Sequence, residues 1–127
     1  MDKILAEISA GELIDKITIL EIKKEKINNK EKLIEVNKEL ISLNETLKRS
    51  INDKSKISSF KNDLKNINLK RWDIEDGKRL AEKNNQFDEK FIELARSVYK
   101  FNDERAKIKL AINNALGSNI KEVKSYE

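Results

Sequence analysis

The stretch that most constrains the fold is Phe87–Ala115, which carries two apolar stripes at helical spacing. The first alternates steps of three and four residues, the pattern of closely packed helices. Its members are Phe91, Leu94, Val98, Phe101, Arg105, Ile108, Ile112 and Ala115. The second stripe, on a neighbouring face, comprises Ile92, Ala95, Tyr99, Asn102 and Ala106. So wide an apolar arc predicts a helix buried on two sides, in the middle of a three- or four-helix bundle.

Both ends of this helix carry recognisable signals. Asp88 is a good N-cap, because its carboxylate can accept hydrogen bonds from the free amides of the first turn. Phe87, just before it, is spaced to pack on Ile92 as a hydrophobic staple. Gly117 predicts the C-terminal end, because glycine adopts the left-handed cap conformation without steric cost.

The chain is poor in residues that break helices, since its 127 residues include no proline and three glycines. This composition favours an all-α fold. We expect an antiparallel bundle of three to four long helices with coiled-coil-like packing, forming a single domain over residues 1–127. Helices at Phe60–Asn84 and Phe87–Ala115 are predicted to form its core hairpin.

Caps and seams divide the rest of the chain. Ser9–Glu12 has the form of a capping box, so a helix is expected to begin there. At Asn28–Glu31 the apolar stripe changes register, and Asn28 with Glu31 can act as an N-terminal cap, which slightly favours a break over a kink. The new seam comprises Leu33, Val36, Leu40, Leu43 and Leu47. The polar stretch Ser50–Ser59 is typical of a loop. Residues 119–127 are expected to dock as a tail, either extended or as a last helical turn.

Composition excludes several functions. The chain has neither cysteine nor histidine, which removes disulfides, thiol nucleophiles, Cys/His zinc sites and imidazole acid–base catalysis. The net charge is +4, but lysines are interleaved with acids, so nucleic-acid binding is not expected. No apolar run is long enough for a membrane span or a signal peptide, and the cytoplasm is the expected location.

Arg105 interrupts the first stripe of the long helix. A guanidinium buried without a partner would cost several kcal/mol. Arg105 can avoid that cost at the rim, with its stem on apolar surface and its head in water. It can also be a paired charge inside a cleft, where it could contact a ligand. The sequence leaves both arrangements open.

Cationic and polar side chains that face the bundle, or lie nearby on the same helices, are the candidate ligand contacts. They are Arg71, Arg79, Arg96, Tyr99, Asn102 and Arg105. Helical enzymes of the chorismate-mutase type bind a dicarboxylate between helices with such groups. The first helix of this chain has no arginine, which counts against that comparison.

Two acidic pairs are spaced three residues apart, Glu12 with Asp15 and Asp73 with Asp76. Such carboxylates share a helix face and could hold a divalent cation, as in magnesium-dependent all-α nucleotide pyrophosphatases. Without histidine or cysteine, any metal would need oxygen ligands. Capping by Glu12 and an ion pair of Asp76 with Arg79 explain the pairs equally well. We therefore expect no cofactor, with magnesium as the alternative.

The segment Trp72–Asp76 is expected to lie beside Arg96–Tyr99 and Asn102–Arg105 in the core hairpin. Ion pairs between the helices, with Trp72 packed over them, are the structural interpretation. A polar notch for a sugar, a phosphate or a partner's helix is the functional one.

Four segments are distinctive as a set. They are GELIDKITILEIK (Gly11–Lys23), WDIED with Arg79, FDEKFIELARSVYKFNDERAKIKLAIN (Phe87–Asn113) and GSNIKEVKSY (Gly117–Tyr126). With them the chain resembles an uncharacterised family of small all-helical bacterial proteins, a domain of unknown function. The resemblance implies an association with glycosyltransferases and other surface-polysaccharide proteins, and it implies no mechanism.

Two classes of function follow. The first is an accessory or interaction protein for cell-surface glycan biosynthesis, with a glycosyltransferase or another protein as partner and an exposed apolar patch. The second is a small all-α enzyme or binder of an anionic metabolite or nucleotide, with arginines or the Asp73 and Asp76 pair converging in a pocket. Long helices with doubled stripes also predict a homodimer, because a chain of this length has few ways to cover them alone.

Overall fold

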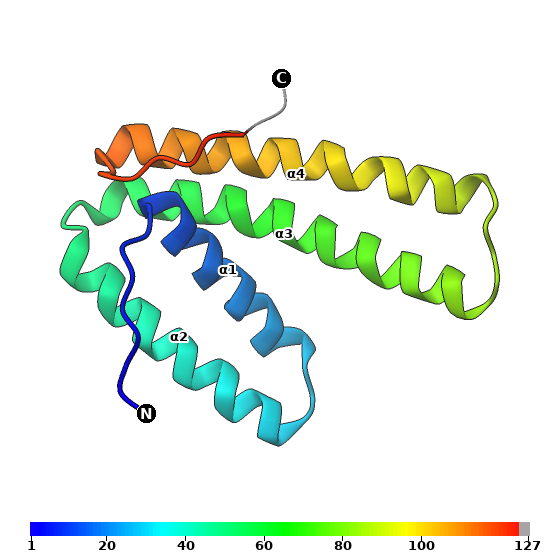
Figure 1. The fold of residues 1–127 in the computed structure, drawn as a ribbon, viewed down its shortest axis with the longest axis horizontal. Coiled ribbons are helices and arrows are strands. Elements are labelled where there is room, and N and C mark those ends of the chain that lie inside the picture. The colour runs from blue at the N-terminus through cyan, green and yellow to red at the C-terminus, as the bar shows by residue number, and fades with distance from the viewer. Residues whose placement is uncertain (125–127) are drawn as a thin grey trace.

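A computed structural model describes residues 1–124, which form four helices and no strand. The helices are α1 (Ala10–Lys26), α2 (Lys30–Ser50), α3 (Lys54–Lys83) and α4 (Glu89–Leu116). They form two hairpins, α1–α2 and α3–α4, which diverge as a V (Figure 1). The all-α prediction is confirmed.

The helix in the middle of the fold is α1, which packs against each of the other three. One core cluster joins α1 to α2 and contains Leu13, Ile17, Leu20, Val36 and Leu40. A second cluster joins α1 to α3 and α4 and contains Ile14, Ile57, Leu64 and Ile112. The apolar residues of α1 therefore point to two sides, which makes this short helix the centre of the bundle.

The prediction that Phe87–Ala115 is buried on two sides is wrong for the first half of α4. That half pairs with the second half of α3 and extends beyond the end of α1 (Figure 1). We call this projecting part, residues 73–101, the distal arm. On it the second stripe faces solvent, since Ile92 is 50% exposed and Tyr99 62% exposed. The periodicity of the sequence correctly indicated an apolar face in this half of α4, but no helix of the described chain covers that face.

The ends of α4 follow the predicted signals. Asp88 is the N-cap and accepts a hydrogen bond from the amide of Phe91 at 3.3 Å. Gly117 is the C-cap, with a left-handed φ of +65°. The ring of Phe87 packs edge-on against Phe91, with centroids 5.4 Å apart, whereas Ile92 had been expected as its neighbour.

The starts of α2 and α3 differ from the predictions. The predicted break is present, but Asn29 rather than Asn28 caps α2, accepting from the amide of Lys32 at 3.0 Å. Of the predicted loop Ser50–Ser59, only residues 51–53 lie outside helices, because Ser50 ends α2 and Asp53 caps a helix that starts at Lys54. Ile57 is buried there, so tertiary packing stabilises a helical turn whose polar residues alone favour a loop.

The tail after α4 is extended as far as it is described. Glu122 lies 3.2 Å from Nζ of Lys109, and Nζ of Lys124 lies 2.5 Å from Asp103. Of the two predicted conformations, residues 118–124 thus adopt the extended one, and residues 125–127 lie outside the described part. No helix in residues 1–124 is long and apolar enough to cross a membrane.

Candidate functional site

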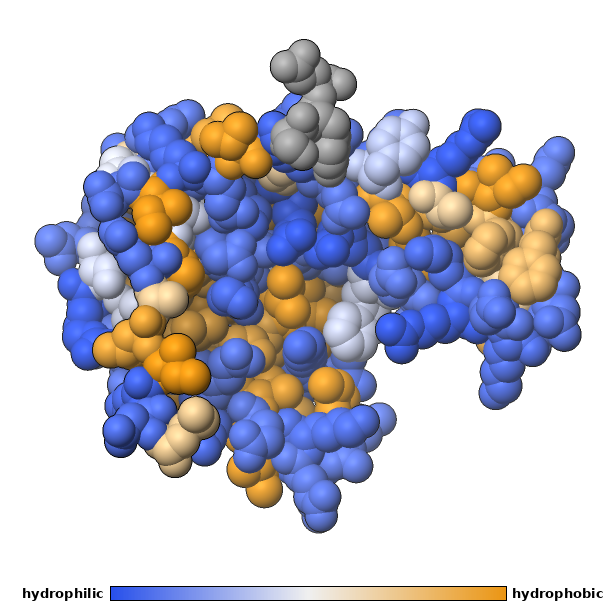
Figure 2. Space-filling view, viewed as in Figure 1, coloured by the Kyte–Doolittle hydropathy of each residue, from blue (hydrophilic) through white to orange (hydrophobic). Residues whose placement is uncertain are grey.

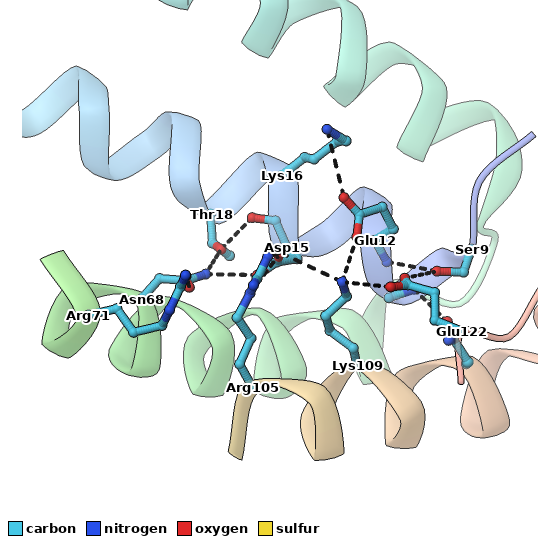
Figure 3. A network of polar contacts seen from close by, with 12 residues as sticks. Ser9, Glu12, Asp15, Lys16, Thr18, Asn68, Arg71, Arg105, Lys109 and Glu122 are labelled. Carbon is cyan, nitrogen blue, oxygen red and sulfur yellow. Dashed lines mark hydrogen bonds and ion pairs between the residues drawn. The ribbon is translucent and has the colours of Figure 1, made fainter. Parts of the chain in front are cut away.

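A buried ion pair joins α1 to α4 (Figure 3). The Asp15 side chain is 0% exposed. Both of its oxygens accept hydrogen bonds from Nε of Arg105 at 3.0 Å, and Nη2 of Arg105 donates to Oδ2 as well. A guanidinium that binds a carboxylate through two of its nitrogens is held in a fixed orientation. Of the two arrangements considered for Arg105, the paired charge is the one observed.

The protonation of this pair follows from its surroundings. Burial raises the pKa of the Asp15 carboxyl, but hydrogen bonds from Arg105 and Asn68, with the charges of Arg105 and Lys109, outweigh it. The pKa of Asp15 therefore lies below its ordinary value. The hydrogen bond to Asp15 raises the pKa of Arg105 above its ordinary value. Both groups are charged at neutral pH.

The close approach of α1 to α4 at Gly11 positions the pair of Asp15 and Arg105. The amide of Gly11 donates to Oδ1 of Asn113 on α4 at 2.7 Å. A Cβ atom at Gly11 would lie 2.5 Å from the carbonyl oxygen of Lys109, so only glycine fits there. Because Asp15 follows Gly11 by one helical turn, the contact brings its carboxylate to Arg105.

Lys109 of α4 forms ion pairs with two further carboxylates near the start of α1, those of Glu12 and Glu122. Its Nζ lies 2.5 Å from Oε2 of Glu12 and 3.2 Å from Oε2 of Glu122. Oγ of Ser9 accepts from the amide of Glu12 at 3.0 Å and donates to Glu122 at 3.0 Å. Ser9 therefore caps α1 as predicted. The capping box also predicted a hydrogen bond from the backbone to the carboxylate of Glu12, but this carboxylate binds Lys109 instead.

On the other side of Asp15, Asn68 of α3 connects the ion pair to Arg71. The Nδ2 atom of Asn68 donates to Asp15 and to Oγ1 of Thr18, both at 2.9 Å. These two bonds turn the amide oxygen of Asn68 outward, where it accepts from Nη1 of Arg71 at 3.0 Å. Arg71 is thus oriented by a buried chain of hydrogen bonds that begins at Asp15.

Arg71 lines a pocket of about 350 Å³ between α1 and α3. Figure 2 shows the surface hollowed between the two hairpins. We call this the α1–α3 pocket. It is lined by Ile19, Ile22, Asn68, Arg71, Trp72, Glu75, Asp76 and Arg79. The lining combines an apolar wall with the guanidinium groups of Arg71 and Arg79 and the carboxylates of Glu75 and Asp76.

Neither arginine of the α1–α3 pocket is bonded to a carboxylate within the described chain. Among residues 1–124, no ion pair includes Arg71 or Arg79. Glu75 stands one turn from each of them, but it pairs with Lys78 at 3.4 Å. The expected ion pair of Asp76 with Arg79 is likewise not formed.

The structure separates the predicted ligand contacts into groups. Arg71 and Arg79 line the α1–α3 pocket, whereas Arg105 is not part of its lining and is paired with Asp15. Arg96 and Tyr99 are exposed on the distal arm and do not line the pocket. The last predicted ligand contact is Asn102 of α4. Its buried Oδ1 accepts no hydrogen bond from any described residue.

The segment Trp72–Asp76 lies at the level of Arg96–Tyr99 in the α3–α4 hairpin, as expected, but no ion pair within residues 1–124 joins the two segments. Trp72 lines the α1–α3 pocket with Ile19 and Ile22 of α1. The face of α3 that meets α4 is a different one, marked by Lys70 over the ring of Phe101 and by Gly77 against Leu94.

The acidic pairs are arranged differently from the predicted cation site. A divalent cation at Glu12 and Asp15 would have to displace Lys109 and Arg105 from their carboxylates. Asp73 and Asp76 are exposed. Within residues 1–124, no three acidic side chains gather as a metal site.

Sequence reasoning missed Asn68, Lys109 and Gly11. Asn68 was detectable, because it follows Leu64 by four residues and so falls on the core-facing side of its helix. Lys109 adjoins Ile108 of the first stripe and gives no comparable signal. Gly11 was treated as part of a cap, since its contact with α4 is visible only in three dimensions.

The fold and this site define a small four-helix protein in which a buried carboxylate–guanidinium pair adjoins an arginine-lined pocket. The chain belongs to DUF6165, a family of unknown function, which matches residues 4–127. No curated protein and no solved structure matches it. The resemblance is thereby confirmed as a domain of unknown function. The bacterial origin and the link to polysaccharide genes stay predictions.

Proposed function

We propose that the protein binds a small organic anion in the α1–α3 pocket. Arg71 and Arg79 would contact the carboxylate or phosphate, and Ile19, Ile22 and Trp72 would contact an apolar or planar body. The single observation that supports this most is the state of Arg71, a partly buried guanidinium with no carboxylate partner in the described chain.

The charge of Arg71 is only partly compensated by its surroundings. Burial, and after it the nearby charge of Arg105, lower the pKa of the Arg71 guanidinium from its ordinary value, although the charges of Asp15 and Glu75 act in the opposite direction. Its hydrogen bond to Asn68 uses one of five N–H donors and supplies no negative charge. An oxyanion in the pocket would offset both the desolvation and the repulsion, and a guanidinium can bind it through two donors.

The same groups define which part of a ligand would go where. The oxyanion would bind at Arg71, because the hydrogen bond to Asn68 holds its guanidinium in place. The body would lie against Trp72, whose ring can stack on a planar group. Glu75 and Asp76 add two carboxylates to the lining, so a ligand with further anionic groups would have to direct them toward Arg79.

Tryptophan fluorescence provides a direct test, because Trp72 is the only tryptophan in the chain. We would titrate two anions with their uncharged counterparts, AMP with adenosine and phenylacetate with phenylacetamide. At least one anion is expected to change the emission of Trp72 with saturation, and its counterpart to bind more weakly. Arg71→Gln should weaken that binding about tenfold or more, because hydrogen bonds to charged groups contribute roughly 1.5–3 kcal/mol.

Arg49→Gln is the matched control. Arg49 is an exposed arginine in the last turn of α2 and does not line the pocket, so its replacement removes the same charge without touching the site. Equal weakening by both variants would mean a nonspecific charge effect. Binding of the anion and its neutral counterpart with equal affinity, unaffected by Arg71→Gln, would refute the proposal.

The second candidate is the interaction protein, and its supporting observation is the exposed stripe on the distal arm. Its partner could be a glycosyltransferase or a second copy of the chain. Loss of binding at the pocket would leave this candidate standing, because the stripe and the pocket share no residue.

A further inference from the structure

The distal arm presents an apolar row to solvent. Phe87, Ile92 and Tyr99 are each at least half exposed. Figure 2 shows hydrophobic residues gathered on the arm over α4 and the α3–α4 turn. Ile92 and Tyr99 belong to the second stripe of α4, whose spacing of three and four residues is that of a surface packed by another helix. Phe87 lies just before the N-cap of the helix.

The covered part of this stripe shows what kind of element fits it. Continuing the seven-residue spacing from Ile92 and Tyr99 leads to Ala106 and Asn113. At Asn113 the stripe is covered by α1, through the hydrogen bond from Gly11. The same face of α4 is therefore packed by a helix at one end and uncovered at the other.

The charges beside the exposed row would match the same charges on a second copy of the chain. Glu89 and Arg96 are seven residues apart, so they occupy the same heptad position on the flank of the row. Both are exposed, and neither forms an ion pair within the described chain. Such flanking charges set partner choice and orientation where helices pair.

We propose that two copies associate through their distal arms, with α4 antiparallel to α4 of the partner subunit. Antiparallel pairing about a two-fold axis near Ile92 places Arg96 opposite Glu89 of the partner subunit, twice. The same register packs Ile92 against Ile92 of the partner subunit and brings Tyr99 to the partner's Phe87. The exposed apolar row and both unpaired charges are then used by a single symmetric contact.

Charge reversal tests both the surface and the register. Light scattering over a concentration series should show the wild-type chain approaching twice its 14.8 kDa mass. Glu89→Arg and Arg96→Glu should each raise the dimer dissociation constant about tenfold or more, because each puts two like-charged pairs at the interface. The double variant Glu89→Arg/Arg96→Glu should recover the wild-type value. Since both residues are exposed, circular dichroism should show unchanged helix content.

Two outcomes would overturn this proposal. One is a wild-type chain that remains monomeric throughout the series. The other is a dimer that persists unchanged in both reversals and in Ile92→Asp, which would place the contact on another face. Fluorescence titration of the α1–α3 pocket is independent of either result.

Discussion

Arg105→Met is expected to lower the free energy of unfolding by about 3–5 kcal/mol, the usual cost of removing one partner of a buried ion pair. The variant keeps an apolar stem but leaves Asp15, with its fully buried side chain, to Asn68 and to Lys109, whose Nζ is 4.0 Å away. Urea unfolding followed by circular dichroism would measure the loss.

The pH dependence should change sign in the same variant. In the wild type the folded pKa of Asp15 lies below the unfolded value, so its contribution is complete above pH ~4 and is lost as pH falls through the folded pKa. Without Arg105, burial dominates and raises the folded pKa of Asp15. Stability should then be lost as pH rises through the unfolded pKa, until Asp15 ionises in the folded state as well.

An exposed ion pair supplies the comparison. Lys65 bonds Glu25 at 2.8 Å, but Glu25 lies largely in solvent. Lys65→Met should therefore lower the free energy of unfolding far less than Arg105→Met does. An Arg105→Met variant as stable as Lys65→Met, with the acid sensitivity of the wild type, would mean that the buried pair contributes little to folding.

The sequence could place Arg105 on a core-facing stripe but could not choose between rim and buried pair. The choice depends on Asp15, which lies 90 positions away in the chain and was itself assigned to an acidic pair with Glu12. Spacing along one helix identifies which residues share a face. It does not identify the residue on another helix that meets them.

The same limit explains the misplaced centre of the bundle. The doubled stripe of α4 was correctly identified as apolar, yet its first half has no helix to cover it within the described chain. The caps at Ser9, Asp88 and Gly117 were predictable because each is a local hydrogen-bonding or backbone requirement. The pocket was partly predictable, through Arg71 and Arg79, but its wall from α1 required the packing of helices far apart in sequence.

Gly11→Ala is expected to cost about 3 kcal/mol, at the upper end of overpacking effects in a close-packed site. The new Cβ would lie 2.5 Å from the carbonyl oxygen and 3.0 Å from Cα of Lys109. These are backbone atoms of α4, so the helices must separate. Separation would also stretch the 2.7 Å hydrogen bond from Gly11 to Asn113 and loosen Asp15 from Arg105. Thermal or urea unfolding of the purified variant would measure the effect.

Gly77→Ala is the matched control, because it makes the same replacement inside a helix against a yielding neighbour. There the Cβ would lie 3.1 Å from Cδ1 of Leu94, a side-chain methyl on the partly exposed arm that can turn aside. Alanine favours a helix interior by about 0.8–1.0 kcal/mol over glycine, so this variant should match or exceed the wild type in stability. Equal stability changes in the two variants would show that helix propensity, and not the approach of α1 to α4, sets the effect at Gly11.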